Sequence, residues 1–380
     1  MVELSKKTAS GRSIAMTRVV EINTLERLRG YRLHWNWLLS DTREATFFQT
    51  FDWLETYLRH HGERLRLRVL LVSGSDGPIG ILPLVVCREA MRVGSVRVMT
   101  YPMDGWGTFY GPIGPQPTAT LLAGLRHIAA TPRDWDLVDL RWIDADGLDK
   151  GRTRQALRGA GLPAPQQPLM QAAQIELSSD WAAYWSSREP DWRREVDRSR
   201  RRLAERGMEY VRYRPAGEFS GDADPRWDLY DACEEIARRS WQGSSTDGTT
   251  LSHESVRSYL RDAHEAAAAA GGVDLNLLRI DGRPAAFAYN YHFAGQVYGL
   301  RAGFDPSAAP SGSGTVLLRL MVEDSFRRGD QRIDLGPDSL EYKRRWATRI
   351  QTSYHYPHYA AAGVMAQALR AKRWLIGARR

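Results

Sequence analysis

Val297-Tyr298-Gly299-Leu300-Arg301-Ala302-Gly303-Phe304 reads as a strand, and the loop Pro310-Ser311-Gly312-Ser313-Gly314-Thr315 and a helical run to Arg328 follow it. A second strand, Arg332-Ile333-Asp334-Leu335-Gly336, then ends in an acid, and Glu341-Tyr342-Lys343-Arg344-Arg345-Trp346 comes after it. A glycine-rich turn that opens a helix directs unpaired backbone N–H groups and the positive end of the helix at an anion. The order strand, loop, helix, strand therefore predicts a phosphate-binding loop at residues 311–315.

The length of the chain, 380 residues, predicts two domains, because a single hydrophobic core rarely grows that large. Hydrophobic residues make up 43% of the chain and include 13 tryptophans, which is enough apolar surface for two cores. The net charge of +8 favours an anionic partner. Charge alone leaves coenzyme A, a nucleic acid and a polyanionic glycan open.

Two cysteines, Cys87 and Cys233, form neither a disulfide framework nor a zinc set, which is typical of a reducing cytoplasm. We expect no bound metal. The longest apolar run, near residues 79–87, is too short to cross a bilayer. Residues 1–17 are polar and slightly basic, so we expect a disordered tail on a cytoplasmic protein without a membrane span.

The chain contains a repeat offset by about 200 residues, as a duplicated domain would. Residues 68–82 and 274–287 each read as a strand, an Asp-Gly turn and a second strand. Residues 136–141 likewise resemble residues 331–336, and each copy has a helical segment between these features, at 117–130 and 314–329. We predict domains at 18–165 and 172–365 on either side of a Gly/Pro/Gln-rich loop, and a basic helix or tail at 366–380.

The two copies differ in the loop that opens the helix. The first copy reads Gly111-Pro112-Ile113-Gly114-Pro115-Gln116-Pro117, in which three prolines remove three N–H donors. The second copy, Ser311 to Thr315, keeps every donor and adds hydroxyl groups at Ser313 and Thr315. We therefore predict that the second domain binds the cofactor through Ser311, Gly312, Ser313, Gly314 and Thr315, and that the first domain does not.

Several motifs resemble the GNAT acyltransferase superfamily, and more closely the tandem bacterial proteins of the cellulose-biosynthesis acetyltransferase-like family, relatives of the Fem-type aminoacyl transferases. The segment Phe47 to Leu54 resembles the opening of that family, 193–207 its basic helix and Ser240-Trp241 its mid-domain motif. The most specific match is Asp334-Leu335-Gly336 followed by Tyr342-Lys343 and Trp346. The superfamily has Gln or Arg three residues before the first glycine of its pyrophosphate loop, where this chain has Ala309.

The resemblance implies an α/β fold with mixed sheets in two tandem GNAT-like domains. It implies acyl transfer from acetyl-CoA or another acyl-CoA to an amine or hydroxyl acceptor, such as a small molecule or a saccharide in polysaccharide biosynthesis. Two alternatives stay open: a Fem-like aminoacyl transferase that uses charged tRNA, and an accessory protein without catalysis. The acceptor, the acyl chain length and the oligomeric state are left open.

A two-residue turn between Phe293 and Gln296 would set Tyr291 opposite Tyr298 and His292 opposite Val297. One sheet face then carries large apolar residues, which are typical of a core. The other face would carry Asn290, His292, Arg301 and Gly303 among small residues. We predict that Asn290 and Arg301 contact substrate there, although a plain solvated face explains the pattern equally well. We expect Trp241 to line the acceptor pocket.

Acylation of an amine needs a base for the acceptor proton and an acid for the leaving thiolate. His292 and Asp334 are alternative bases. Tyr342 is the candidate acid because the resembled superfamily often places a tyrosine after this strand, and Lys343 could hold an oxyanion or a phosphate. The structural alternatives are that Asp334 caps the next turn and that Tyr342 and Trp346 belong to an aromatic core.

The segment from Arg188 to Arg206 contains eight arginines and a narrow apolar stripe of Trp192, Val196 and Leu203. The spacings Glu189–Arg193, Glu195–Arg198 and Asp197–Arg201 predict ion pairs within a solvated helix. We therefore expect few arginines to remain for nucleic acid, and tRNA stays the less favoured partner.

Overall fold

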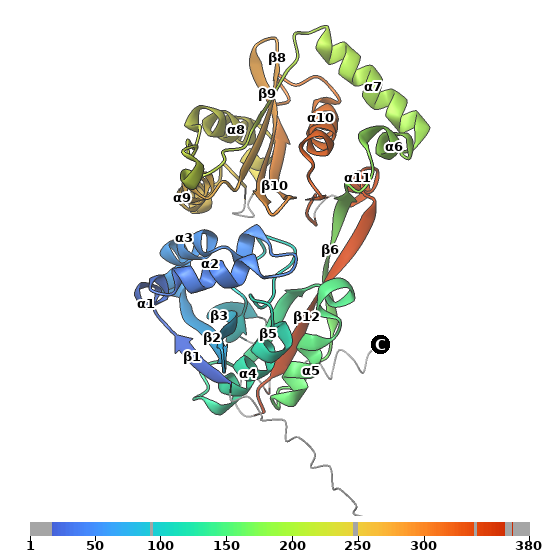
Figure 1. Ribbon diagram of the computed structural model, residues 1–380. Coiled ribbons are helices and arrows are strands. Elements are labelled where there is room, and N and C mark those ends of the chain that lie inside the picture. The colour runs from blue at the N-terminus through green and yellow to red at the C-terminus, as the bar shows by residue number, and fades with distance from the viewer. Residues whose placement is uncertain (1–16, 92–93, 246–249, 338–339, 362–366, 368–380) are drawn as a thin grey trace, which may run out of the picture.

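The computed structural model describes residues 17–91, 94–245, 250–337, 340–361 and 367. Its strands form one mixed sheet in the order β1-β2-β3-β4-β5-β12-β6-β11-β10-β9-β8-β7. Helices cover this sheet in two lobes, one above the other in Figure 1. The α/β fold class is therefore as predicted, and the sheet runs through both lobes without a break.

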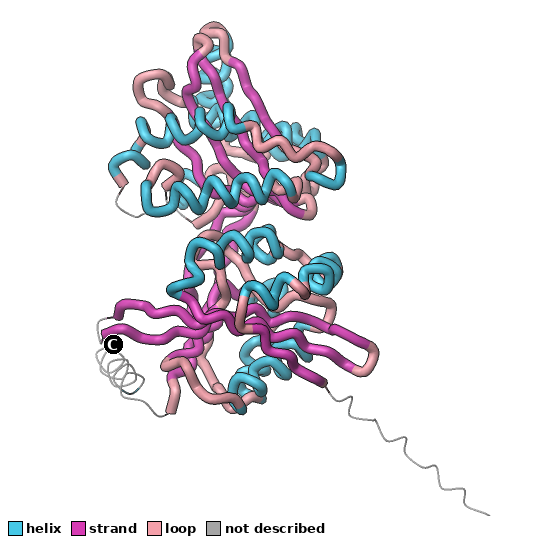
Figure 2. Tube along the Cα trace, turned by 90° about the vertical axis from the view of Figure 1, so that its left-hand side faces the viewer, coloured by secondary structure: helices cyan, strands magenta, loops and turns pink. Residues whose placement is uncertain are grey.

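The N-terminal lobe contains β1 (Arg18–Ile22), α1 (Leu25–Arg29), α2 (Arg32–Ser40), α3 (Phe51–His61), β2 (Leu65–Gly74), β3 (Gly77–Met91), β4 (Gly94–Thr100), α4 (Pro117–Ala130), β5 (Leu137–Ile143) and α5 (Arg152–Gly159). The helix expected at 117–130 is therefore confirmed as α4. Strands β1 to β4 are antiparallel neighbours, whereas β4 and β5 are parallel. Figure 2 shows the same lobe from the side.

The C-terminal lobe repeats this order. It contains α6 (Trp181–Ser186), α7 (Pro190–Ala204), β7 (Glu209–Tyr213), α8 (Trp227–Arg239), α9 (Glu254–Ala269), β8 (Val273–Ile280), β9 (Arg283–Phe293), β10 (Gln296–Phe304), α10 (Ser313–Arg328), β11 (Arg332–Asp334) and α11 (Leu340–Arg344). Strands β7 to β10 are antiparallel, and β10 and β11 are parallel. The repeat seen in the sequence is thus a repeat of the fold.

Two long strands join the lobes. β6 (Gln167–Glu176) pairs with β12 (Arg349–Tyr359) in antiparallel fashion, while β12 also pairs with β5 and β6 also pairs with β11. β12 therefore lies between β5, the last strand of the N-terminal lobe, and β6. β6 in turn lies between β12 and β11, the last strand of the C-terminal lobe (Figure 1). Residues 349–359, which we assigned to the second domain, complete the sheet of the first lobe.

The predicted hairpin register is observed: Tyr298 lies opposite Tyr291 and Val297 opposite His292. Asp281 and Gly282 have φ values of 52° and 75°, as a tight turn between β8 and β9 requires. The tail expected at 1–17 and the helix or tail expected at 366–380 lie outside the described residues, apart from Thr17 and Gln367. In the part of the chain that the structure describes, no helix is long and apolar enough to cross a membrane.

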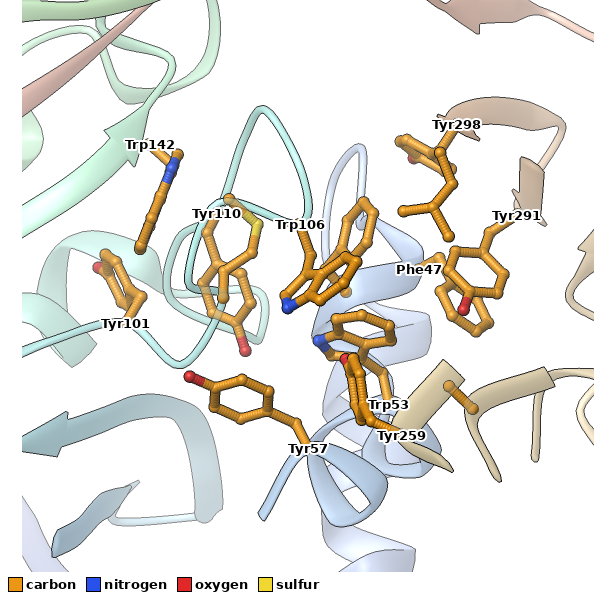
Figure 3. Packing of buried hydrophobic residues seen from close by; sticks show 14 of the residues in the cluster. Phe47, Trp53, Tyr57, Tyr101, Trp106, Tyr110, Trp142, Tyr259, Tyr291 and Tyr298 are labelled. Carbon is orange, nitrogen blue, oxygen red and sulfur yellow. The ribbon is translucent and has the colours of Figure 1, made fainter. Parts of the chain in front are cut away.

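An aromatic core connects the lobes (Figure 3). The Phe47 ring from the N-terminal lobe stacks on Tyr291 of β9 with 4.1 Å between ring centroids. Trp53 of α3 packs edge-on against Tyr259 of α9 at 5.6 Å. A Cβ atom on Gly272 would lie 2.4 Å from the Phe47 ring, so only glycine fits where Phe47 enters the other lobe. The interface is thus packed like a single protein interior.

We expect the buried His264 to make stability depend on pH. It accepts a hydrogen bond from the Tyr289 hydroxyl at 3.0 Å and donates one to the Pro225 carbonyl at 2.6 Å, which suits the neutral ring. Burial lowers the pKa of His264 from 6.5 to about 4. The contribution of His264 to the free energy of unfolding is therefore complete above pH 6.5 and is lost as the pH falls towards 4. Over this range His264 binds a proton more tightly in the unfolded chain than in the folded protein.

The expected loss is about 3 kcal/mol of unfolding free energy between these limits. Urea unfolding of the wild type and of His264→Gln at pH 7 and pH 4.5 measures it. The wild type should lose more stability than the variant on acidification. Equal losses of stability in the two proteins would contradict the proposed role of His264 in the pH dependence.

Candidate active site

Strands β10 and β11 diverge near the middle of the C-terminal lobe. They pair only over residues 296–298 and 332–334, whereas β10 continues to Phe304. A Cβ atom on Gly299 would lie 3.0 Å from the Asp334 carbonyl oxygen, so the backbones are still in contact where they separate. Beyond Tyr298, where the two strands open, β10 pairs with β9 alone among the described strands, and its end at Phe304 lies beside Gly314 at the start of α10.

A bulge in β10 lies at this opening and corrects one prediction. The register with β9 shifts between Gly299 and Arg301, so Arg301 pairs with Tyr289 rather than with a residue of the Asn290 face. Arg301 consequently lies over the Trp106 ring of the N-terminal lobe, 5.2 Å from its centroid. The predicted position of Arg301 beside Asn290 and His292 is therefore wrong, because an extra residue in one strand reverses the faces beyond it.

The predicted phosphate loop does open a helix. Gly312 has a φ of 91° and is the N-cap of α10, and no side chain caps the first turn there. The Ser313 hydroxyl donates to the Pro310 carbonyl at 2.6 Å and fixes the turn. Arg202 of α7 donates to the Ser311 carbonyl at 2.6 Å, which brings a positive charge beside the helix end. The loop therefore combines the helix dipole with a cationic side chain.

Exposed aromatic side chains lie around the loop. Phe304 at the end of β10 is 46% exposed, and its ring lies 3.8 Å from the Cβ position of Gly314. Tyr342 of α11 is 40% exposed, and its hydroxyl donates to Thr315 Oγ1 at 3.4 Å. Trp241 is 61% exposed and precedes Gln242, which donates to the Ala302 carbonyl of β10 at 3.0 Å. Phe304 and Tyr342 thus border the first turn of α10, whereas Trp241 lies next to a residue that contacts β10.

Asp334 ends β11 on the face that meets the N-terminal lobe, and it is buried. Its Oδ1 accepts a 2.8 Å hydrogen bond from the Gly336 N–H, so the structural alternative of a turn cap is observed. Burial raises the pKa of Asp334, and the Gly336 N–H, Thr108, Lys343 and Gln174 oppose that change. A carboxylate with a raised pKa is a suitable proton acceptor near neutral pH.

Tyr342 and Lys343 lie on the opposite side of the same opening. Burial of its hydroxyl raises the pKa of Tyr342, so the phenol carries its proton at neutral pH. Lys343 Nζ donates to the Gly336 carbonyl at 3.4 Å, and its charge favours ionised Asp334. Lys343 thus lies near Asp334, and Tyr342 lies beside Thr315 in the first turn of α10.

His292 and Asn290 lie elsewhere, on the face that α10 covers. His292 Nε2 lies 3.5 Å from Asp330 Oδ1, before the start of β11. Asn290 is buried, and its side-chain amide donates to Asp274 Oδ2 at 3.3 Å. Asp334 is in register with Tyr298, which is on the other face of the sheet. The structure therefore does not bring His292 and Asn290 to the opening.

The ion pairs expected within α7 are wrong. The helix pairs Asp191 with Arg194, while Asp197 contacts Arg319 of α10 at 3.3 Å. Glu189 instead caps the helix by accepting from the Asp191 and Trp192 N–H groups. Within the described residues, Arg198 and Arg201 are exposed and form no ion pair. The apolar stripe of Trp192, Val196 and Leu203 is buried, as predicted.

Sequence reasoning missed the residues that the N-terminal lobe contributes. The Thr108 side chain lowers the pKa of Asp334 and so lies close to it, and Trp106 contacts Arg301. These residues are more than 190 positions from their partners in the sequence, so no local pattern indicated the contacts. Among the described residues, no group of three or more His, Cys, Asp or Glu side chains is arranged to hold a metal ion.

Comparison with known proteins assigns a class to this architecture. Residues 191–344 match the family model of the acetyltransferase (GNAT) domain. This match covers the opening, the α10 loop, Tyr342 and Lys343. The C-terminal lobe therefore carries a GNAT-type acetyltransferase domain, and the chain has the fold of an acyltransferase. No curated protein matches the chain.

Solved structures show the same two-lobed fold. FemX is similar over 87% of this chain and 96% of its own, with a TM-score of 0.59 and 12% identity. The C-terminal domain of a protein assigned as a lysylphosphatidylglycerol synthetase from Agrobacterium fabrum is similar over 90% of this chain and 96% of its own, with a TM-score of 0.55 and 12% identity. At these identities the likeness concerns the fold alone.

Proposed function

We propose that this protein transfers an acyl group from an acyl-CoA, acetyl-CoA being the simplest, to an amine or hydroxyl acceptor in a ternary complex. The observation that carries the proposal is the divergence of β10 and β11, with the start of α10, which no side chain caps, beside the end of β10 and with Asp334 and Lys343 near the point of separation. The N–H groups of 311–315 would hold the pyrophosphate, and Arg202 adds charge. Beyond Tyr298 the edge of β10 that faces away from β9 would lie along the pantetheine arm.

The proposed roles follow from the positions of the three ionisable groups. Asp334 accepts a proton from the acceptor amine while the nitrogen attacks the thioester carbonyl carbon. The new N–C bond forms as the C–S bond breaks, and Tyr342 donates its proton to the leaving thiolate. Lys343 stabilises negative charge at the opening. We retain Trp241 and Arg301 as acceptor contacts, and we assign His292 and Asn290 to the support of the sheet.

A second donor, a charged tRNA, is favoured by one observation. The exposed, unpaired Arg198 and Arg201 lie on α7, the helix that also places Arg202 at the α10 loop. Such a donor would bind in a strongly salt-dependent manner, because each neutralised phosphate releases counterions. The Phe47 to Leu54, Asp334 to Gly336 and Trp346 motifs support membership of the cellulose-biosynthesis acetyltransferase-like family, which suggests a saccharide acceptor in the cytoplasm.

A thiol-release assay tests the proposed function. Purified protein is incubated with acetyl-CoA and a panel of amines and amino sugars, and free CoA thiol is followed against a sample without acceptor. Acceptor-dependent release supports acyl transfer. Release with none of the acceptors, together with tight and salt-sensitive tRNA binding, would favour the tRNA donor instead. If the protein shows neither acyl transfer nor tRNA binding, an accessory function without catalysis is favoured.

The position of His292 gives a prediction of its own. Because its ring lies on the α10 face, His292→Ala should leave the rate of acyl transfer within about threefold of wild type, less than 1 kcal/mol in the barrier. Its loss should instead weaken the contact with Asp330 and lower thermal stability. A loss of activity by orders of magnitude, in a protein that melts normally, would return His292 to the role of base.

A further inference from the structure

A basic surface lies at the end of the N-terminal lobe that points away from the C-terminal lobe, where α4 and α5 lie in Figure 1. The two helices are in contact, because a Cβ atom on Gly159 would lie 3.0 Å from the Leu122 side chain. Residues 112–133 and 150–173, which contain both helices, include no Asp or Glu. Their exposed cationic side chains are Arg126, Arg133, Lys150, Arg154 and Arg158. We call these side chains the basic face.

The charges of the basic face are not neutralised by the described residues around them. Arg126 Nε donates to a backbone carbonyl, that of Gly159, at 3.3 Å, and Arg133 lies over the Trp135 ring. The nearby carboxylate of Asp134 is already bound by Arg66 and Arg68, at 3.1 and 2.9 Å. Like charges gathered on one surface repel each other and attract an anionic partner. The basic face therefore has an excess of positive charge that is available to such a partner.

The chain beyond Ala361 begins beside the basic face. The ring of His358, near the end of β12, packs edge-on against Trp135 at 6.0 Å, and its Nδ1 donates at 3.0 Å to the Pro163 carbonyl after α5. The Ala360 N–H donates to the Asp136 carbonyl at 3.1 Å. The sequence that follows has no acid and contains Arg370, Lys372, Arg373, Trp374, Leu375, Ile376, Arg379 and Arg380. The end of the chain therefore adds cations, and an apolar run among them, next to the same surface.

Two observations favour a phospholipid bilayer over a nucleic acid as the partner. A tryptophan and aliphatic residues flanked by Lys and Arg are typical of segments that bind the interface of an anionic membrane. RNA loops and single strands are instead held by exposed aromatic rings that stack on the bases. Among the described residues, the large exposed apolar side chains lie outside α4 and α5.

We propose that the basic face, together with the cations of residues 370–380, docks this protein on the anionic surface of a phospholipid bilayer. Clusters of about four to eight Lys and Arg bind anionic headgroups, and each charge contributes through an attraction that fades within a Debye length. The basic face lies at the opposite end of the molecule from α10 (Figure 1). Docking would therefore leave the candidate active site uncovered, and the inference does not depend on the proposed acyl transfer.

Co-sedimentation of the full-length protein with vesicles tests the proposal. The protein should bind vesicles of phosphatidylcholine that contain a quarter of phosphatidylglycerol, and it should not bind phosphatidylcholine alone. Binding should fall steeply between about 0.1 and 0.5 M salt, because salt shortens the Debye length. The binding that remains at high salt should be lost in Trp374→Ser, because burial of an apolar side chain is not screened.

Paired double variants locate the contact. Arg154→Gln/Arg158→Gln should weaken binding to the anionic vesicles about tenfold. Arg27→Gln/Arg43→Gln removes the same charge from exposed positions of the N-terminal lobe outside the basic face, and its binding should stay within about twofold of wild type. Thiol release by Arg154→Gln/Arg158→Gln without vesicles should equal that of wild type.

Three outcomes would overturn the proposal. One is that the wild type does not bind the anionic vesicles, and another is that the two double variants weaken binding equally. The third comes from titration of the same proteins with tRNA. If Arg154→Gln/Arg158→Gln weakens the binding of tRNA and leaves vesicle binding unchanged, the basic face binds a nucleic acid instead.

Discussion

Asp334→Asn should lower the rate of acyl transfer by about a hundredfold or more, the usual contribution of a positioned general base. The amide keeps the size of the carboxylate and can still accept from the Gly336 N–H, so the turn after β11 should survive. Binding of acyl-CoA should be nearly unchanged, because Asp334 does not face the α10 loop. Steady-state thiol release and calorimetry on the same variant measure the two effects.

The pH dependence gives an independent check on Asp334. Burial raises the pKa of its carboxyl group, and a base works only when ionised, so the wild-type rate should fall as the pH drops through that raised value. Asp334→Asn should lose this limb of the profile. If Asp334→Asn retained both the rate and the acid limb, Asp334 would be only the cap of its turn.

Asp274→Ala should destabilise the protein by about 3–5 kcal/mol, because it leaves buried charges without compensation. Asp274 is fully buried and binds Arg212 Nε at 2.8 Å, and Arg214 Nε lies 3.3 Å away. The Arg212 and Arg214 charges lower the pKa of Asp274, although burial alone would raise it. This network fastens β7 and β8 to the end of α10.

Asp228→Ala is the matched control for Asp274→Ala. Asp228 forms an equally short ion pair with Arg226, at 2.8 Å, but both side chains are largely exposed. Its removal should cost less than about 1 kcal/mol. Urea unfolding of both variants at neutral pH makes the comparison. Similar losses would show that the buried network adds no more than a surface pair.

Local sequence patterns predicted much of the C-terminal lobe. The turn at Ala294 and Gly295 fixed the register of β9 and β10, and the Ser/Gly loop correctly predicted the start of α10. These features depend on neighbours in the sequence. Their prediction therefore did not depend on contacts with the other lobe.

The missing parts depend on distant contacts. The bulge after Gly299 reversed the face of Arg301, and nothing in the alternation of side chains indicates an inserted residue. The exchange of β6 and β12 joins segments almost 200 residues apart, so no local pattern indicates which lobe each strand completes. Thr108 reaches Asp334 only because the aromatic core docks the lobes.

Calorimetric titration of acetyl-CoA into wild type, Gly314→Pro and Gly314→Ala tests the donor site most directly. Proline in the first turn of a helix is tolerated but removes an N–H donor. Alanine keeps that donor, and its Cβ would lie an ordinary 3.8 Å from Phe304.

The proposed site predicts that Gly314→Pro weakens acetyl-CoA binding about tenfold or more, the effect of a lost hydrogen bond to a charged group. Gly314→Ala should remain within about threefold of wild type. Equal binding by all three proteins, or no binding by the wild type, would contradict a donor held at the start of α10.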